Sequence, residues 1–300
     1  MSNLTLKCYP RVTHAMHGML VSMDAEELAA RWRERLESWA IPDEILAKAV
    51  ADPWSHSPER FGTRTDRALA EPDDGPTMTR LAEALPDKGT LLDVGSGPGA
   101  SSLPLHERIG HLYAVDTSAS MLEGLTSRAD KLGVPVTTVE GRWPDVAGRV
   151  PVADVTVSAH VVYNVPDLAP FLRALDDHTQ GRVVIELPHR HPMSWLTPLW
   201  QHFHGVDRPV RPIAEDCVAL AAAMGFPVQV EERESPPGTF HLAGGAGPER
   251  LPPGVPRPLA GRGGRRDRDG AGHVADAARP LGHHLVGITG GAGTLSSMSP

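Results

Sequence analysis

TLLDVGSGPGA, residues 90–100, joins a short apolar run to an acidic residue and three alternate glycines. The apolar run predicts a buried strand. The glycines predict a tight turn, because glycine adopts positive φ and has no Cβ to hold a ligand away from the backbone. Residues 101–109 are then predicted to form a helix, whose first N–H groups have no partner within the helix. Strand, turn and helix start together indicate a site for a nucleotide-type ligand.

A second acidic residue follows at the end of the next predicted strand. Residues 111–116 (HLYAVD) predict a strand that ends in Asp116, 21 residues beyond Gly95. This is near the usual separation between a glycine turn and the carboxylate that accepts hydrogen bonds from ribose hydroxyls. The two acids therefore point to one ligand that carries a sugar.

Two ligand classes use a turn of this kind. Gly95, Gly97 and Ala100 satisfy the G-x-G-x-x-G/A pattern of dinucleotide-binding proteins, so an NAD(P)-linked oxidoreductase is one interpretation. Asp93, however, stands two residues before the first glycine, which is a poor place for a carboxylate if a pyrophosphate lies on the turn. The same carboxylate suits a cofactor with a cationic amino-acid end. A turn that only reverses the chain explains neither Asp93 nor Asp116.

The string DVGSGPG at residues 93–99, followed by Asp116, resembles the first two motifs of the class I S-adenosylmethionine-dependent methyltransferases. The resemblance implies S-adenosylmethionine as the cofactor and methyl transfer as the activity. Because a motif match has a real false-positive rate, the oxidoreductase stays as an alternative. A methyltransferase-like protein that binds the cofactor without catalysis is another.

The resemblance also implies a role for each matched position. The first acid and the turn would hold the methionyl end of the cofactor, the second acid would bind both ribose hydroxyls, and later residues would lie along the adenine. The residues at the methionyl end are Asp93, Gly95, Ser96 and Gly97, and Gly99 would permit the close approach of the helix. Asp116 would bind the ribose. The residues along the adenine are Thr117, Met121, Gly141, Arg142 and Trp143, and Ser158, at the end of the fourth strand, is also predicted to bind the cofactor. The family's acidic residue at the third strand is missing unless Glu140 supplies it. An indole at position 143 more commonly packs in a core.

The segment after the fourth predicted strand faces the acceptor in this family. It reads SAHVVYN at residues 158–164 and lacks the Asn- or Asp-Pro-Pro-aromatic motif of enzymes that methylate nucleic-acid amino groups or glutamine side chains. A small-molecule acceptor is therefore expected, with His160 and Tyr163 as the candidate catalytic contacts. The cofactor brings its own activated methyl group, so the protein mainly aligns the reactants and excludes water. His160 would act as a base only for an acceptor that arrives protonated.

From Thr90 onwards, predicted strands and helices alternate, which indicates a parallel sheet with helices on both faces. Strands are predicted at residues 90–94, 111–116, 134–139, 154–158, 182–187 and 227–231, and helices at 117–132, 167–175 and 214–224. The expected fold is α/β: a doubly wound, mostly parallel, class I methyltransferase-like sheet with N-terminal helices and an irregular C-terminal tail. The expected parts are a helical cap region (1–76), the cofactor-binding core (77–235) and the tail (236–300).

Three helices are predicted before the first strand. Asp24 and Glu27 form a capping box for the first, which runs to about residue 40. The others are predicted at 42–51 and 77–85, with a loop that contains Trp54 and Phe61 between them. The apolar face of the first helix is expected to pack in the core, or alternatively to cap the substrate side; its residues are Leu28, Trp32, Leu36 and Trp39.

Composition limits the partners. The net charge is −8, which argues against a broad nucleic-acid surface, because such a surface needs clustered Lys and Arg. No apolar run approaches the 18 residues of a membrane span, and the first residues do not form a signal peptide, so a cytoplasmic protein with no membrane partner is expected. Cys8 and Cys217 give neither a disulfide framework nor a metal-type spacing.

Two His-x-His pairs invite a metal interpretation. They are His189 with His191 and His202 with His204. Neither pair is flanked by a third ligand, so the preferred interpretation is a lid of Trp and Pro residues beyond the fifth strand, and no metal is predicted.

The tail has a different composition from the rest of the chain. Residues 241–300 contain 14 Gly and 7 Pro but no Phe, Trp or Tyr. By composition this segment is predicted to be disordered. The family normally ends with an antiparallel hairpin, of which the sequence indicates only the first strand, near Val228. Besides a disordered tail, an out-of-frame terminus remains open, and the other reading frames of the coding DNA would test it.

Overall fold

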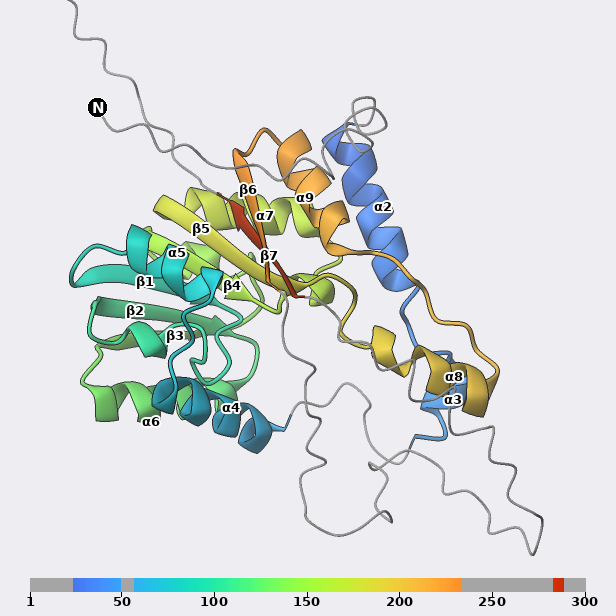
Figure 1. The fold of residues 1–300 in the computed structure, drawn as a ribbon, viewed down its shortest axis with the longest axis horizontal. Helices are drawn as coiled ribbons and strands as arrows, with labels where there is room; N and C mark the ends of the chain where they lie inside the picture. The colour runs from blue at the N-terminus through green and yellow to red at the C-terminus, as the bar shows by residue number, and fades with distance from the viewer. Residues whose placement is uncertain (1–23, 50–56, 234–282, 289–300) are drawn as a thin grey trace, which may run out of the picture.

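The computed structural model describes residues 24–49, 57–233 and 283–288 (Figure 1). A seven-stranded sheet lies at its centre, in the order β3-β2-β1-β4-β5-β7-β6. The neighbours from β3 to β5 are parallel, and β7 is antiparallel to both β5 and β6. The predicted doubly wound, mostly parallel α/β fold is therefore confirmed.

The strands are β1 Gly89–Val94, β2 Ile109–Asp116, β3 Val136–Glu140, β4 Ala153–Ala159, β5 Thr179–Pro188, β6 Val228–Arg233 and β7 His283–Ile288. The helices are α2 Ala25–Glu37, α3 Asp43–Leu46, α4 Pro58–Ala70, α5 Pro76–Ala84, α6 Ala119–Leu132, α7 Leu168–Asp177, α8 Thr197–His204 and α9 Ala214–Ala223. No helix among these described residues is long and apolar enough to cross a membrane.

Alternate residues of the central strands pack into two hydrophobic clusters, one on each face of the sheet. In β5, Val183, Ile185 and Leu187 lie in the cluster formed with α2, α7 and α9, whereas Val184 lies in the cluster formed with α5 and α6. Successive side chains of a strand point to opposite faces. A strand covered by helices on both sides is therefore expected to be apolar at nearly every position, as this run of β5 is except at Glu186.

The segment after the glycine turn differs from its prediction. Residues 101–109 form turns and one short 3₁₀ helix, Leu103–Leu105, instead of an α-helix. Pro104 lies inside this segment and removes a backbone donor, and β2 already begins at Ile109. Too few residues remain between the turn and the strand for an α-helix to nucleate and propagate.

The region before the first strand also differs in part. Within the described residues the helix predicted at 42–51 is the single turn α3, and the loop predicted around Phe61 is wrong, because Phe61 lies in α4. The Ser57 hydroxyl caps α4 by accepting a backbone N–H at 3.4 Å, and Pro58 occupies the first turn. This Ser-Pro start is the signal that the loop prediction overlooked. Trp54 lies outside the described residues.

A strand from the tail completes the sheet. β7 lies between β5 and β6 and pairs with both, so the prediction of an irregular, disordered tail at 236–300 is wrong for residues 283–288. The stretch HHLVGI is only six residues long, follows Gly282 and itself contains Gly287. A composition averaged over the whole tail therefore conceals it. The remainder of the predicted tail lies outside the described residues.

The N-terminal helix α2 packs against the sheet as the core interpretation predicts. Asp24 caps it by accepting the Glu27 N–H at 2.8 Å. Trp32 is 1% exposed, donates its indole N–H to the Val165 carbonyl oxygen at 2.8 Å and stacks on Tyr163 with ring centroids 5.8 Å apart. One indole thus ties α2 to the segment that follows β4.

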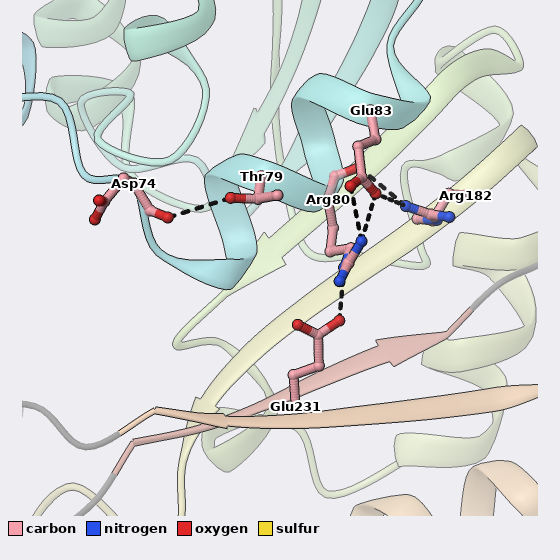
Figure 2. Close-up of polar contacts among 6 residues, drawn as sticks. All are labelled: Asp74, Thr79, Arg80, Glu83, Arg182 and Glu231. Carbon is pink, nitrogen blue, oxygen red and sulfur yellow. Dashed lines mark hydrogen bonds and ion pairs between the residues drawn. The ribbon is translucent and has the colours of Figure 1, made fainter. Parts of the chain in front are cut away.

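An ion-pair network holds α5 across the far part of the sheet (Figure 2). Arg80 of α5 donates to Glu231 of β6 at 2.6 Å and to both carboxylate oxygens of Glu83, which also pairs with Arg182 of β5 at 3.3 Å. These contacts lower the pKa of the Glu83 carboxyl. Because β7 lies between β5 and β6, the network connects the two strands that the tail strand separates.

We expect Trp32→Ala to lower the free energy of unfolding by about 3–5 kcal/mol, because it leaves a cavity and an unpaired carbonyl. Trp32→Phe keeps an aromatic ring against Tyr163 but loses the indole donor, so it should cost roughly half as much. Urea denaturation followed by circular dichroism measures both values. Equal losses in the two variants would contradict the importance of ring packing here.

Candidate functional site

The glycine turn is attached to β2 through its own backbone. β1 and β2 run in parallel, and the N–H groups of Gly95 and Ser96 both donate to the Val115 carbonyl oxygen, at 2.8 and 3.0 Å. Asp116 then accepts the Gly97 N–H at 2.8 Å through one carboxylate oxygen and the Ser118 N–H at 2.9 Å through the other. The second predicted acid therefore fixes the turn that the first predicted acid precedes.

Each glycine of the turn has positive φ, but their surroundings differ. A Cβ on Gly95 would overlap Val161, and one on Gly99 would lie 2.6 Å from a Leu103 methyl group. A Cβ on Gly97, where φ is 50°, would meet no atom within 4 Å. Gly95 and Gly99 thus allow close packing, whereas the backbone of Gly97 borders open space that a ligand can enter.

Asp93 is a buried carboxylate without a partner. Its side chain is 1% exposed, and neither carboxylate oxygen has a hydrogen-bond partner among the described residues. Burial raises the pKa of Asp93 to about 7; the nearby Ser102 hydroxyl opposes this rise, and the charge of Asp116 adds to it. A cationic group beside Asp93 would supply the missing interaction, so the site fits a ligand with an ammonium or sulfonium charge.

The remaining residues predicted to bind the adenosine lie around the ends of β2 and β3. Gly141 donates its N–H to the Asp116 carbonyl oxygen at 2.9 Å, which brings the end of β3 to the second acid. Thr117 and Arg142 are exposed, and Met121 is buried in the first turn of α6. Ser96, which was predicted to hold the methionyl end, is buried within the glycine turn.

Two predicted cofactor residues have structural roles. Trp143 is 5% exposed within the core and packs edge-on against the His178 ring at 5.1 Å, so its alternative interpretation as a packing residue fits the structure. Ser158 is fully buried and donates its hydroxyl to the Val94 carbonyl oxygen at 3.1 Å. This bond joins β4 to the end of β1 and leaves the Ser158 hydroxyl no donor for a ligand.

His160 lies at the carboxyl edge, next to the turn. It directly follows β4, and its neighbour Val161 packs against Gly95. Its Nε2 atom lies 2.9 Å from Arg64 Nη2 and 3.3 Å from Glu186 Oε1. The structure therefore places this predicted residue among charged groups, next in sequence to the Val161 side chain that packs against Gly95.

Tyr163 does not fit its predicted role in contacting the acceptor. It is 3% exposed, and its hydroxyl faces the carbonyl oxygens of Pro188 and His189 at 3.0 and 3.1 Å. Burial raises the pKa of the Tyr163 phenol well above its usual range. The short 3₁₀ helix at Val162–Asn164 turns this ring under α2, which periodicity does not reveal.

The residues around His160 were missed by the sequence analysis. Glu186 lies near the end of β5 and accepts the Thr77 hydroxyl at 2.8 Å, and Arg64 comes from α4. An acid at the end of a predicted strand is the same signal that identified Asp116, so Glu186 was recognisable. Arg64 was not predicted as a site residue, because the sequence analysis assigned a loop to the residues that form its helix, α4.

The His-x-His pairs do not form a metal centre in the described part of the chain, which contains no group of three His, Cys, Asp or Glu side chains that could hold a metal ion. His191 is buried and stacks on Trp39 with ring centroids 4.0 Å apart. Burial and the charge of Arg208 lower the pKa of His191 to about 4, so the ring is neutral near pH 7. His202 and His204 lie on the exposed helix α8.

A parallel sheet with a glycine turn and two acids at its carboxyl edge is typical of proteins that bind nucleoside-type ligands. Residues 91–180 match the family model described as "Methyltransferase domain". An uncharacterized protein of Haemophilus influenzae is 33% identical over 96 residues, which are 32% of this chain and 35% of that protein. The chain thus matches this curated relative over only about a third of the relative's length.

Two solved structures are similar to the chain. Magnesium protoporphyrin IX methyltransferase from Synechocystis PCC 6803, solved with bound SAH, has a TM-score of 0.45 at 12% identity, with 87% of this chain and 99% of that chain covered. A SAM-dependent methyltransferase from Aquifex aeolicus has a TM-score of 0.41 at 20% identity, with 60% and 93% covered. Residues 91–180 of the chain are therefore similar to a methyltransferase domain.

We expect Asp93→Asn to stabilise the protein in the absence of ligand. The folded-state pKa of about 7 lies above the ordinary value, so the stability that this carboxyl contributes falls as the pH rises from about 4 to about 7. Asn carries no charge, and we expect a gain of roughly 2 kcal/mol in the free energy of unfolding at pH 8 that shrinks towards pH 4.

The measurement is urea denaturation at pH 5 and pH 8, with exposed Asp145→Asn as the control for removal of one charge. A loss of stability in the Asp93 variant at pH 8 would show that this carboxylate is already compensated in the free protein.

Proposed function

We propose that the protein binds S-adenosylmethionine at the carboxyl edge of β1 and β2 and transfers its methyl group to a small-molecule acceptor. The observation that carries this proposal is the buried carboxylate of Asp93, neither oxygen of which has a hydrogen-bond partner among the described residues. The methionyl end of this cofactor carries an ammonium group, and its sulfur is a sulfonium. Asp93 would hold the methionyl end, with Gly97 leaving room for it.

Asp116 would bind the ribose. Each of its carboxylate oxygens already accepts one backbone N–H, from Gly97 and from Ser118. A carboxylate oxygen can accept a second hydrogen bond, so both ribose hydroxyls can be bound without loss of the contacts that fix the turn. Thr117, Met121 and Gly141 lie where the adenine would follow.

The alternative, an NAD(P)-linked oxidoreductase, is less well supported. Such proteins place the pyrophosphate at the start of an α-helix, where the helix dipole and free N–H groups bind it. Here a 3₁₀ helix of three residues, Leu103–Leu105, follows the turn. The charge of Asp93, ahead of the turn, would also oppose a pyrophosphate.

A small acceptor fits the charge of the chain. A net charge of −8 is unfavourable for a nucleic-acid acceptor. The segment after β4 also lacks the Asn- or Asp-Pro-Pro-aromatic motif, and in its place His160 stands beside the turn. The proposed acceptor site is therefore the edge between His160 and Gly97.

Isothermal titration with S-adenosylhomocysteine and, separately, with NADH tests the cofactor. We expect S-adenosylhomocysteine to bind and Asp93→Asn to weaken it by about 10- to 100-fold, because a charge-assisted contact is lost. Asp145→Asn is the matched control and should bind as the wild type does. Binding of NADH alone would support the oxidoreductase, and S-adenosylhomocysteine binding without turnover of any acceptor would indicate an inactive relative.

A second test uses two glycines with similar backbones. Gly97 and Gly133 both have positive φ, 50° and 69°, and in both cases an added Cβ meets no atom within 4 Å. Gly133 ends α6, away from the turn. We expect alanine at either position to cost about 1 kcal/mol of stability, but only Gly97→Ala to reduce S-adenosylhomocysteine affinity, by at least about tenfold. Equal affinities in the two variants would place the ligand elsewhere.

A further inference from the structure

Three buried polar atoms behind the glycine turn have no hydrogen-bond partner among the described residues. They are the two carboxylate oxygens of Asp93 and the hydroxyl oxygen of Ser102. The Ser102 side chain is fully buried, and its hydroxyl does not cap the short 3₁₀ helix that follows it. Buried polar atoms are nearly always paired in proteins, so a group of three without partners needs a physical explanation.

Asp93 and Ser102 lie on the same face of the sheet. Leu91, two residues before Asp93, and Leu103, next to Ser102, both pack in the cluster formed with α5 and α6. Side chains two residues apart in a strand point to the same face, so β1 directs Asp93 towards the segment that carries Ser102. The Ser102 hydroxyl is near enough to lower the pKa of the Asp93 carboxyl.

The elements packed around Asp93 supply no compensating charge within the described part of the chain. Its neighbours across the sheet are Ala114 in β2 and Val157 in β4, both apolar. The side chains that α5 and α6 contribute to the cluster on this face are apolar as well. The charged group that acts on Asp93 is the carboxylate of Asp116, whose like charge raises the pKa of Asp93.

The protonated form of Asp93 is therefore favoured in the free protein. Burial is the largest cause, and it raises the pKa of this carboxyl to about 7. A neutral carboxyl loses less solvation on burial than a carboxylate does. Near pH 7 the free chain is thus a mixture of protonated and ionised Asp93.

We propose that Asp93 carries a proton in the free protein and releases it when the ammonium end of S-adenosylmethionine binds, and that Ser102 lowers the pH at which this exchange occurs. The inference rests on the proposed function and makes Ser102 a positioning residue that acts through Asp93. The O–H bond of the carboxyl breaks, its electron pair stays on the oxygen, and the proton passes to the buffer. The carboxylate then pairs with the ammonium charge.

The Ser102 hydroxyl suits both states of Asp93. A hydroxyl accepts a hydrogen bond from a protonated carboxyl, and after rotation about its C–O bond it donates one to a carboxylate. Donation favours the ionised form, which is the direction in which Ser102 moves the pKa of Asp93. Without this hydroxyl, the carboxyl would keep its proton to a higher pH.

Cofactor affinity should therefore depend on pH. Below the pKa of free Asp93, each binding event must displace a proton, so the affinity falls as the pH falls. With a free-state pKa of about 7 for Asp93, the affinity for S-adenosylhomocysteine should be about tenfold lower at pH 6 than at pH 8.

Isothermal titration of the full chain with S-adenosylhomocysteine in phosphate and in imidazole counts the protons, because the two buffers differ in enthalpy of ionisation. We expect release of about 0.9 proton per site at pH 6, about 0.5 at pH 7 and about 0.1 at pH 8. Asp93→Asn should release none, and its weaker binding should not change with pH. The exposed control Asp145→Asn should behave as the wild type does.

The compound 5′-methylthioadenosine is the matched ligand control. It keeps the adenosine and the thioether of S-adenosylhomocysteine but lacks the amino-acid end. We expect it to bind without releasing a proton from Asp93. Equal proton release by both ligands would overturn the inference, because the adenosine part rather than the ammonium group would then displace the proton.

The variant Ser102→Ala tests the positioning role. We expect it to move the proton-release profile to higher pH by about one unit, because a hydrogen bond to an ionised group is lost. Ser127→Ala removes an exposed hydroxyl from α6 and should leave the profile unchanged. A purely structural role of Ser102 would lower the free energy of unfolding without moving the profile, and that result would contradict its proposed action on Asp93.

Carbon-13 NMR of the aspartate carboxyl groups in the free chain gives an independent measurement. The Asp93 signal is assigned by its loss in Asp93→Asn, and its pH midpoint should lie near 7. A midpoint of about 4, the ordinary value for aspartate, would overturn the inference. Binding of S-adenosylhomocysteine without proton release at any pH would contradict the inference alone. A chain that fails to bind S-adenosylhomocysteine would contradict the proposed function.

Discussion

The desolvation of the Asp93 carboxylate is the constraint on which the site depends. Parallel strands end at one edge of the sheet, so β1 carries Asp93 into the interior just before the chain turns out to the surface. Without a donor among the described residues, the ionised group is unfavourable there, and its pKa rises to about 7. Folding therefore leaves an uncompensated carboxylate at this edge, and a cationic ligand of the proposed kind would supply the missing interaction.

The second acid has the opposite environment. Both oxygens of Asp116 accept backbone N–H groups, from Gly97 and from Ser118, so this carboxylate organises the turn and the start of α6 before any ligand arrives. A fixed acceptor binds hydroxyls with little reorganisation. The two acids thus differ in role: Asp93 carries an uncompensated charge, and Asp116 fixes the backbone of the turn.

The sequence predicted what depends on local order and missed what depends on distant contacts. The strand-turn-strand unit around Asp93 and Asp116 was predictable, because apolar runs and glycines are local signals. The prediction of a helix at 101–109 was wrong because the sheet fixes the distance between the turn and β2. The prediction that Tyr163 contacts the acceptor does not fit the structure, because its burial under α2 depends on Trp32, 131 positions earlier in the chain. The sequence analysis did not predict β7, because this strand forms through pairing with β5 and β6 and has no clear signal in its composition.

The surroundings of His160 differ from those of Asp93 in their charge balance. Around His160, Arg64 and Glu186 already compensate each other, and Thr77 fixes the carboxylate. Such a group of opposed charges needs no ligand to be stable, so it is preorganised in the free protein.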